Sequence, residues 1–151
     1  MTPANHSTTS RGIFLEADVV VISAVFTRTP PPRSSDGALR SRIYAKLVLE
    51  EPDGYRGDYW WGLGAGGRLG FEVSRSGTQL ISTGMQSTSL HSMPPKISEF
   101  SQFLLSLRYA GFPVGALNDL NSLVGLRMRL VRVPIRGIRA RQTMLICARL
   151  L

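Results

Sequence analysis

Seven arginines near the C-terminus are the first side chains in this sequence that could bind a ligand. All of them follow Asp119, the last acidic residue of the chain. A preference for arginine codons would explain arginine in place of lysine, but it does not explain the missing acids. Because charges of one sign repel each other unless an anionic surface lies against them, the segment favours nucleic acid or an acidic protein surface as partner. The seven are Arg127, Arg129, Arg132, Arg136, Arg139, Arg141 and Arg149.

Three consecutive aromatic residues, Tyr59, Trp60 and Trp61, form the second group. Adjacent residues of a β-strand point to opposite faces, so the two tryptophans cannot both enter the same core. One of them is therefore expected at a surface. There it would either cover a sheet edge or subunit contact, or stack on nucleic-acid bases. The sequence alone leaves both alternatives open and does not say which tryptophan is exposed.

The histidines and the cysteine do not form a catalytic or metal-binding pattern. His6 lies in a polar N-terminal stretch, His91 lies in a polar loop, and Cys147 lies in an apolar run typical of a core residue. We therefore expect no enzyme activity, no metal, no cofactor and no small-molecule substrate. A single cysteine also excludes an intrachain disulfide, which is typical of a reducing compartment.

One stretch, residues 95–113, has a clear helix signal. Ser98 suits the N-cap, Glu99 places a negative charge in the first turn, Gly111 suits the left-handed C′ position, and Pro113 prevents continuation. Large apolar residues fall at i, i+3, i+4 and i+7, which places them on one stripe of the helix. That stripe consists of Phe100, Phe103, Leu104 and Leu107.

Most of the remaining chain predicts strands and turns. Alternating or β-branched runs are separated by turn residues such as Pro52-Asp53-Gly54 and Arg75-Ser76-Gly77, which predict two hairpins. The alternation breaks at residues 19–22 and again at Leu130-Val131, where we expect bulges. The predicted strands span residues 14–27, 43–50, 55–63, 69–73, 78–82, 126–135 and 142–150.

The order of these elements predicts a mainly β fold with one inserted helix between the middle and last strands. A five- to six-stranded barrel with a helix in that place is the OB-like arrangement. A jelly roll, or an antiparallel sheet with a single helix, remains an alternative. We expect a disordered N-terminal arm over residues 1–12 and a single OB-like β-barrel domain over residues 13–151.

Nothing in the sequence indicates a membrane or a secretory route. The longest apolar run, residues 17–26, contains Asp18 and Ser23, and the polar N-terminus has no hydrophobic signal segment. The expected location is therefore the cytoplasm.

Several spaced segments resemble a family of small phage and prophage proteins encoded in replication modules. These segments are YAKLVLEEPDG, YWWGLG, FEVSRSGTQLI, SEFSQFLLSLRYAGFP and LNSLVGLRMRLVRVP, and the similarity covers about residues 15–135. The resemblance implies an OB-fold protein that binds single-stranded DNA. If the protein is phage-encoded, its compartment would be the cytoplasm of the host cell.

These observations predict a protein that binds single-stranded DNA or RNA without sequence specificity, through arginine–phosphate contacts and base stacking. A homo-oligomer is compatible with this prediction. The alternative is a virion or assembly protein, such as a capsid decoration or a ring or tube subunit, whose basic face is a subunit interface. The expected binding residues are Arg40, Arg42, Tyr59, Trp60, Trp61, Arg127, Arg129, Arg132, Arg136, Arg139 and Arg141.

Overall fold

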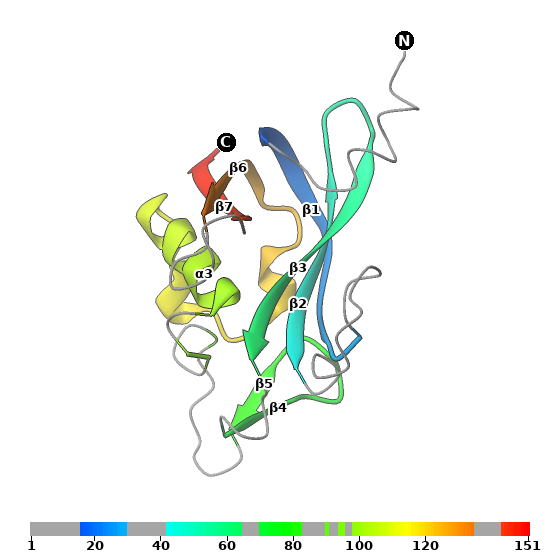
Figure 1. Cartoon of the computed structure of the whole chain (residues 1–151). Helices are drawn as coiled ribbons and strands as arrows, with labels where there is room; N and C mark the ends of the chain where they lie inside the picture. The colour runs from blue at the N-terminus through cyan, green and yellow to red at the C-terminus, as the bar shows by residue number, and fades with distance from the viewer. Residues whose placement is uncertain are drawn as a thin grey trace.

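The fold is mainly β with one α-helix, as the sequence predicts (Figure 1). The computed structural model describes residues 16–29, 42–64, 70–82, 90, 94–95, 98–134 and 143–151. Seven strands, one α-helix and two short 3₁₀ helices lie in this part of the chain. The predicted N-terminal arm, residues 1–12, lies outside the described residues.

Five strands form one antiparallel sheet in the order β3-β2-β1-β6-β7. The central strand β1 pairs with β2 on one side and with β6 on the other. In chain order the helix therefore falls between the third strand of the sheet, β3, and the fourth, β6. The bounds are β1 Glu16–Thr27, β2 Ile43–Glu50, β3 Arg56–Gly64, β6 Arg127–Pro134 and β7 Thr143–Leu150.

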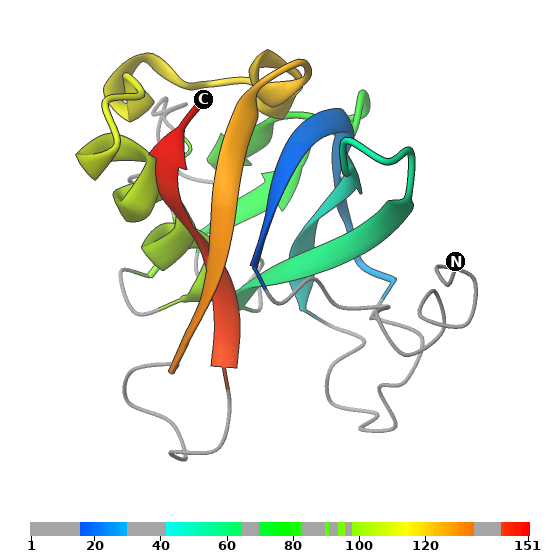
Figure 2. The ribbon, with the colours of Figure 1, turned by 90° about the horizontal axis from the view of Figure 1, so that it is seen from above.

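Strand β1 changes register where its sequence loses alternation. The pairing with β2 shifts between Val21 and Ser23, which confirms the bulge predicted at residues 19–22. Figure 2 shows β1 as a curved strand, the shape that a bulge produces. A second shift separates Arg129 from Leu130 in the pairing of β6 with β7. The bulge expected at Leu130-Val131 of β6 lies instead in the partner strand, because the extra residue at this shift is Ala148 of β7.

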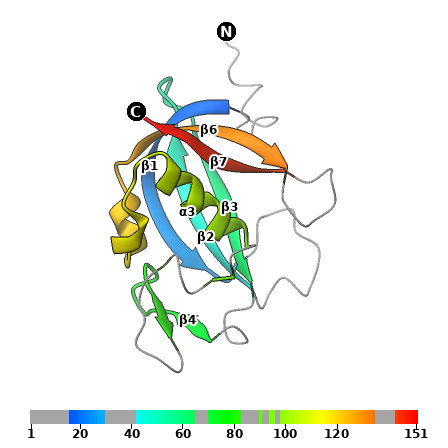
Figure 3. The same ribbon diagram turned by 90° about the vertical axis from the view of Figure 1, so that its left-hand side faces the viewer.

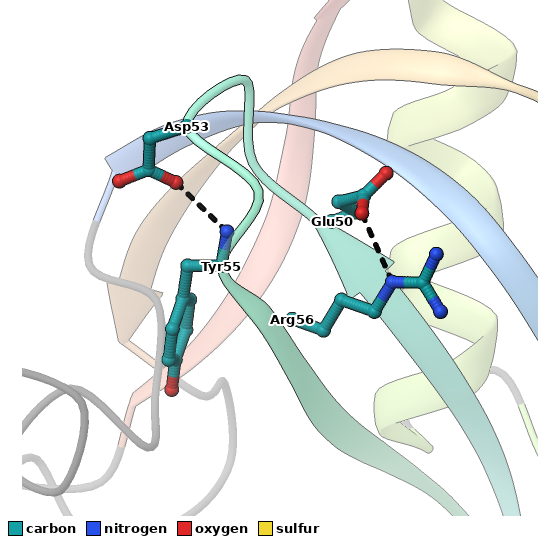
Figure 4. Close-up of polar contacts among 4 residues, drawn as sticks. All are labelled: Glu50, Asp53, Tyr55 and Arg56. Atoms are coloured by element: carbon teal, nitrogen blue, oxygen red, sulfur yellow. Dashed lines mark hydrogen bonds and ion pairs between the residues drawn. The ribbon is translucent and has the colours of Figure 1, made fainter. Parts of the chain in front are cut away.

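Both predicted hairpins are confirmed. The first joins β2 to β3, and the backbone N–H of Tyr55 donates to Asp53 Oδ1 at 2.9 Å across the turn (Figure 4). Gly54 has a φ of 93°, which a residue with a Cβ rarely adopts. Beside this turn the Arg56 guanidinium contacts the Glu50 carboxylate at 2.9 Å.

The second hairpin pairs β4 (Phe71–Val73) with β5 (Leu80–Ser82) as a separate small sheet.

The helix α3 (Glu99–Tyr109) begins and ends close to where its sequence signals predict. Ser98 is the N-cap and its side chain accepts a hydrogen bond from Ser101 N, while Gly111 follows the C-cap with a φ of 106°. The predicted apolar stripe is fully buried. Two 3₁₀ turns, η2 (Val114–Ala116) and η3 (Leu120–Leu123), then lead to β6.

The sheet does not close into a barrel, because its edge strands β3 and β7 do not pair with each other. Instead α3 contacts both edges, and Figure 3 shows it in front of strands β1 to β3. Ser106 Oγ accepts the N–H of Cys147 in β7 at 2.9 Å, and a Glu99 oxygen accepts the N–H of Gly62 in β3 at 3.0 Å. These bonds satisfy edge donors that a neighbouring strand would otherwise take.

Two side chains of β3 complete the contact between the edges. Tyr59 Oη accepts the N–H of Leu145 in β7 at 3.2 Å, and Trp61 Nε1 donates to the carbonyl of Leu145 at 2.8 Å. We call the place where β3, β7 and α3 meet the seam; its residues are Tyr59, Trp61, Glu99, Ser106, Leu145 and Cys147. The predicted barrel is thus replaced by an open sheet, whose edges are bridged by a helix and by side chains.

The core lies between the inner face of the sheet and α3. Residues from β1, β2, β3, β6, β7 and the helix contribute to it, and Cys147 is buried as predicted. No helix within the described residues has the length and the apolar character needed to cross a membrane.

Candidate nucleic-acid interface

The two tryptophans lie on opposite faces of the sheet, as the sequence predicts, and the structure shows which one is buried. Trp61 has no exposed surface. Its ring stacks on Phe103 of α3, with centroids 4.3 Å apart and ring planes 26° apart. With its N–H bonded to Leu145 as well, Trp61 is part of the core and is not accessible to a base.

Trp60 lies on the outer face of the sheet and is partly exposed. It pairs with Lys46 of β2, whose Nζ lies 5.3 Å from the centroid of the indole ring. The same Nζ lies 3.6 Å from Asp58 Oδ2, two residues before Trp60. The indole N–H is covered and has no hydrogen-bond partner within the described part of the chain. Trp60 is therefore the tryptophan on the solvent side of the sheet, where Lys46 lies over its ring.

Lys46 and Asp58 were missing from the predicted site. The sequence did contain a signal for Lys46, because strict alternation in residues 43–50 places it on the solvent face of its strand. What the sequence did not contain is the register that sets Lys46 opposite Trp60. Register across a hairpin depends on the turn, and a shift of one residue would have moved Lys46 away from the ring.

Tyr59 lies on the inner face, in the seam, and not on the outer face with Trp60. Its ring centroid lies 4.5 Å from that of Trp61. Burial raises the pKa of the Tyr59 phenol above its ordinary value, the negative charge of Glu99 raises it further, and the backbone of Leu145 and the charge of Arg132 oppose these effects. The phenol is thus a neutral hydrogen-bonding group between the edge strands rather than a free stacking surface.

Two of the predicted arginines lie among acidic residues of their own chain. Arg129 pairs across the sheet with Asp18, and their side chains contact at 3.0 Å, with Glu16 at 3.9 Å. Arg127 lines a depression of about 410 Å³ together with Asp18, Glu50 and Glu51. Arg129 is therefore paired with acidic residues of β1, and Arg127 lines the same depression as acidic residues of β1 and of the β2–β3 connection.

The remaining predicted arginines fall into two groups. Arg132 donates from Nη1 to Thr143 Oγ1 at 2.7 Å and lies close enough to Tyr59 to affect its pKa. Arg42 is exposed immediately before β2, and its charge lowers the pKa of Glu99. The others, Arg40, Arg136, Arg139 and Arg141, lie outside the described residues.

Glu99 is a half-buried carboxyl at the start of α3 that contributes to the pH dependence of stability. Burial raises its pKa above the ordinary value, against the opposing effects of the Gly62 N–H and of Arg42. A raised pKa means that the folded state binds the proton more tightly than the unfolded chain does. Stability from this group is therefore fully present below the ordinary carboxyl pKa and is lost as pH rises through the raised pKa.

We expect Glu99→Gln to remove this component of the pH dependence. The amide keeps an oxygen that can accept the Gly62 N–H and carries no charge, so the variant should gain stability relative to the wild type as pH rises through the carboxyl range. Urea unfolding at several pH values measures the difference. Glu72→Gln, at an exposed side chain paired with Arg28, is the control. A wild-type-minus-variant difference that does not change with pH would contradict the expectation.

Comparison with protein-family models, with curated proteins and with solved structures gives no match to this chain.

Proposed function

We propose that this chain is an OB-type protein that binds single-stranded nucleic acid without sequence specificity, on the outer face of β2 and β3. The observation that carries the proposal is Trp60, a large aromatic ring placed partly exposed on that face while its neighbour Trp61 fills the core. A base of any identity can stack on an indole, which gives affinity without sequence reading.

The arrangement of elements supports this proposal. OB proteins place one helix between the third and fourth strands of a five-stranded, partly open sheet. They bind single strands on the face of strands 2 and 3 and through the loops that follow strands 1 and 4. In this chain those strands are β2 and β3, and the two connections contain arginines by sequence: Arg40 between β1 and β2, and Arg136, Arg139 and Arg141 between β6 and β7.

Phosphate contacts in this proposal come first from Lys46, which lies at the Trp60 ring. Arg42 is exposed immediately before β2, and Arg132 lies close to Tyr59, where the sheet edges meet. The loop arginines add to them. Arg127 and Arg129 contribute less, because Asp18 and its acidic neighbours offset their charge.

The test is a titration of fluorescence anisotropy with a labelled single-stranded oligonucleotide and its duplex over a series of salt concentrations. We expect the wild type to bind the single strand more tightly than the duplex, with affinity that falls steeply as salt rises. Trp60→Ala should weaken binding by about 1–3 kcal/mol, or roughly 5- to 150-fold, because one stack is lost.

Tyr109→Ala is the matched control for that variant. Tyr109 is an aromatic residue at the end of α3, 83% exposed and away from the β2–β3 face, so its loss should leave binding unchanged. Equal losses in both variants, or no single-strand binding at low salt, would contradict the proposal. A large, salt-stable assembly in size-exclusion chromatography, together with absent binding, would favour the virion or assembly role instead.

A further inference from the structure

The stacking surface of Trp60 is already occupied in the protein without ligand. Lys46 Nζ lies over the indole ring at 5.3 Å from its centroid, within the range in which a cation is attracted to the face of an aromatic ring. A base cannot stack on that side of the ring until the ammonium moves. In the unbound protein, the Lys46 ammonium therefore competes with a base for this face of the indole.

Asp58 forms an ion pair with Lys46. Its carboxylate lies 3.6 Å from Lys46 Nζ, and both side chains belong to the outer face, with Lys46 opposite Trp60 and Val48 opposite Asp58 in the register. The Lys46 and Asp58 side chains are 34% and 40% exposed, so the ion pair is accessible to solvent and can exchange partners.

We propose that the Lys46 ammonium covers the Trp60 ring in the unbound protein, where Asp58 holds it. When a base stacks on the ring, the ammonium moves from the ring to a phosphate. This inference rests on the proposed function. It makes Asp58 a residue that sets affinity without contacting the ligand. One phosphate contact of the bound state would then come from Lys46, and the indole face would be free only while Lys46 is released.

A double-mutant cycle between positions 46 and 58 tests the exchange. Asp58→Asn should tighten single-strand binding about two- to fivefold at low salt, the size expected from releasing an exposed ion pair. Lys46→Met retains an unbranched apolar stem and removes the ammonium, so it should weaken binding and reduce the number of phosphates neutralised by one in the salt dependence. In the Lys46→Met background, Asp58→Asn should have no effect.

Glu50→Gln provides the matched control. Glu50 is paired with Arg56 on the same outer face and does not hold a cation over Trp60, so any effect of removing its charge should be equal in the wild-type and Lys46→Met backgrounds. If the gain from Asp58→Asn also persists in the Lys46→Met background, Asp58 acts by simple repulsion of the strand and the exchange is overturned.

The outcomes separate this inference from the proposed function. Wild-type binding that depends on Trp60 but shows no coupling between positions 46 and 58 would overturn the exchange and leave the binding function intact. Absence of single-strand binding in the wild type would overturn both. An NMR measurement accompanies the cycle. In the unbound protein the εCH₂ protons of Lys46 should show an upfield ring-current shift that is absent in Trp60→Ala, and adding the oligonucleotide to the wild type should remove it.

Discussion

Replacing Trp61 with alanine should destabilise the fold by about 3–5 kcal/mol, the loss expected when a large aromatic side chain is removed from a packed core. The indole is fully buried, stacks on Phe103 and donates a hydrogen bond to Leu145. Its removal would leave a cavity between the sheet and α3, and it would leave the Leu145 carbonyl on the edge of β7 without this donor. Urea or thermal unfolding measures the loss.

Two variants make the Trp61 result interpretable. Trp61→Phe keeps an aromatic ring against Phe103 and lacks the N–H, so it should lose less than Trp61→Ala; its loss combines the missing bond to Leu145 with the smaller ring. Trp60→Ala changes the neighbouring tryptophan on the outer face and should cost clearly less than Trp61→Ala, since Trp60 is partly exposed. Equal losses at positions 60 and 61 would show that the assignment of core and outer face is wrong.

Phe100→Ala should cost a similar amount, about 3–5 kcal/mol, because it detaches the first turn of α3 from the sheet. The Phe100 ring is fully buried and meets Phe26 of β1 edge to face, with centroids 5.7 Å apart. Since α3 bridges the unpaired edges β3 and β7, its loosening should also expose their backbone groups. Unfolding measurements combined with amide hydrogen exchange at Gly62 and Cys147 would detect both consequences.

Leu105→Ala is the control on the same helix. Leu105 is 46% exposed, on the side of α3 away from the core, so its truncation should change stability by about 0.5 kcal/mol or less. A loss at Leu105 as large as that at Phe100 would mean that another face of the helix is packed. Unchanged exchange at Gly62 and Cys147 in Phe100→Ala would mean that the seam is held without the helix.

The local elements of this protein could be predicted from its sequence because their causes are local. The capping residue Ser98, the glycine at position 111 and the spacing of the apolar residues determine α3. The Pro52-Asp53-Gly54 turn brings β2 and β3 together as a hairpin. The loss of alternation at residues 19–22 marks the bulge in β1. Each of these features depends on residues a few positions apart.

The candidate site was only partly predictable. The pleat of a strand requires Trp60 and Trp61 to point in opposite directions, and the sequence shows this much. It could not show which of them faces α3, because that depends on the side of the sheet on which the helix packs. Lys46 was missed for a related reason, since its position over Trp60 follows from the register of two strands.

The arginine segment shows most clearly what the sequence determined and what the tertiary structure decided. The absence of acids after Asp119 is a property of the sequence, and from it we expect an anionic neighbour for these charges. The pairing of β6 with β1 brings Asp18 to Arg129 across 111 positions of the chain, which no local pattern encodes. The tertiary structure likewise decided that the sheet stays open at the seam. Side chains of β3 and α3, rather than another strand, form hydrogen bonds with the backbone groups at the edge of β7.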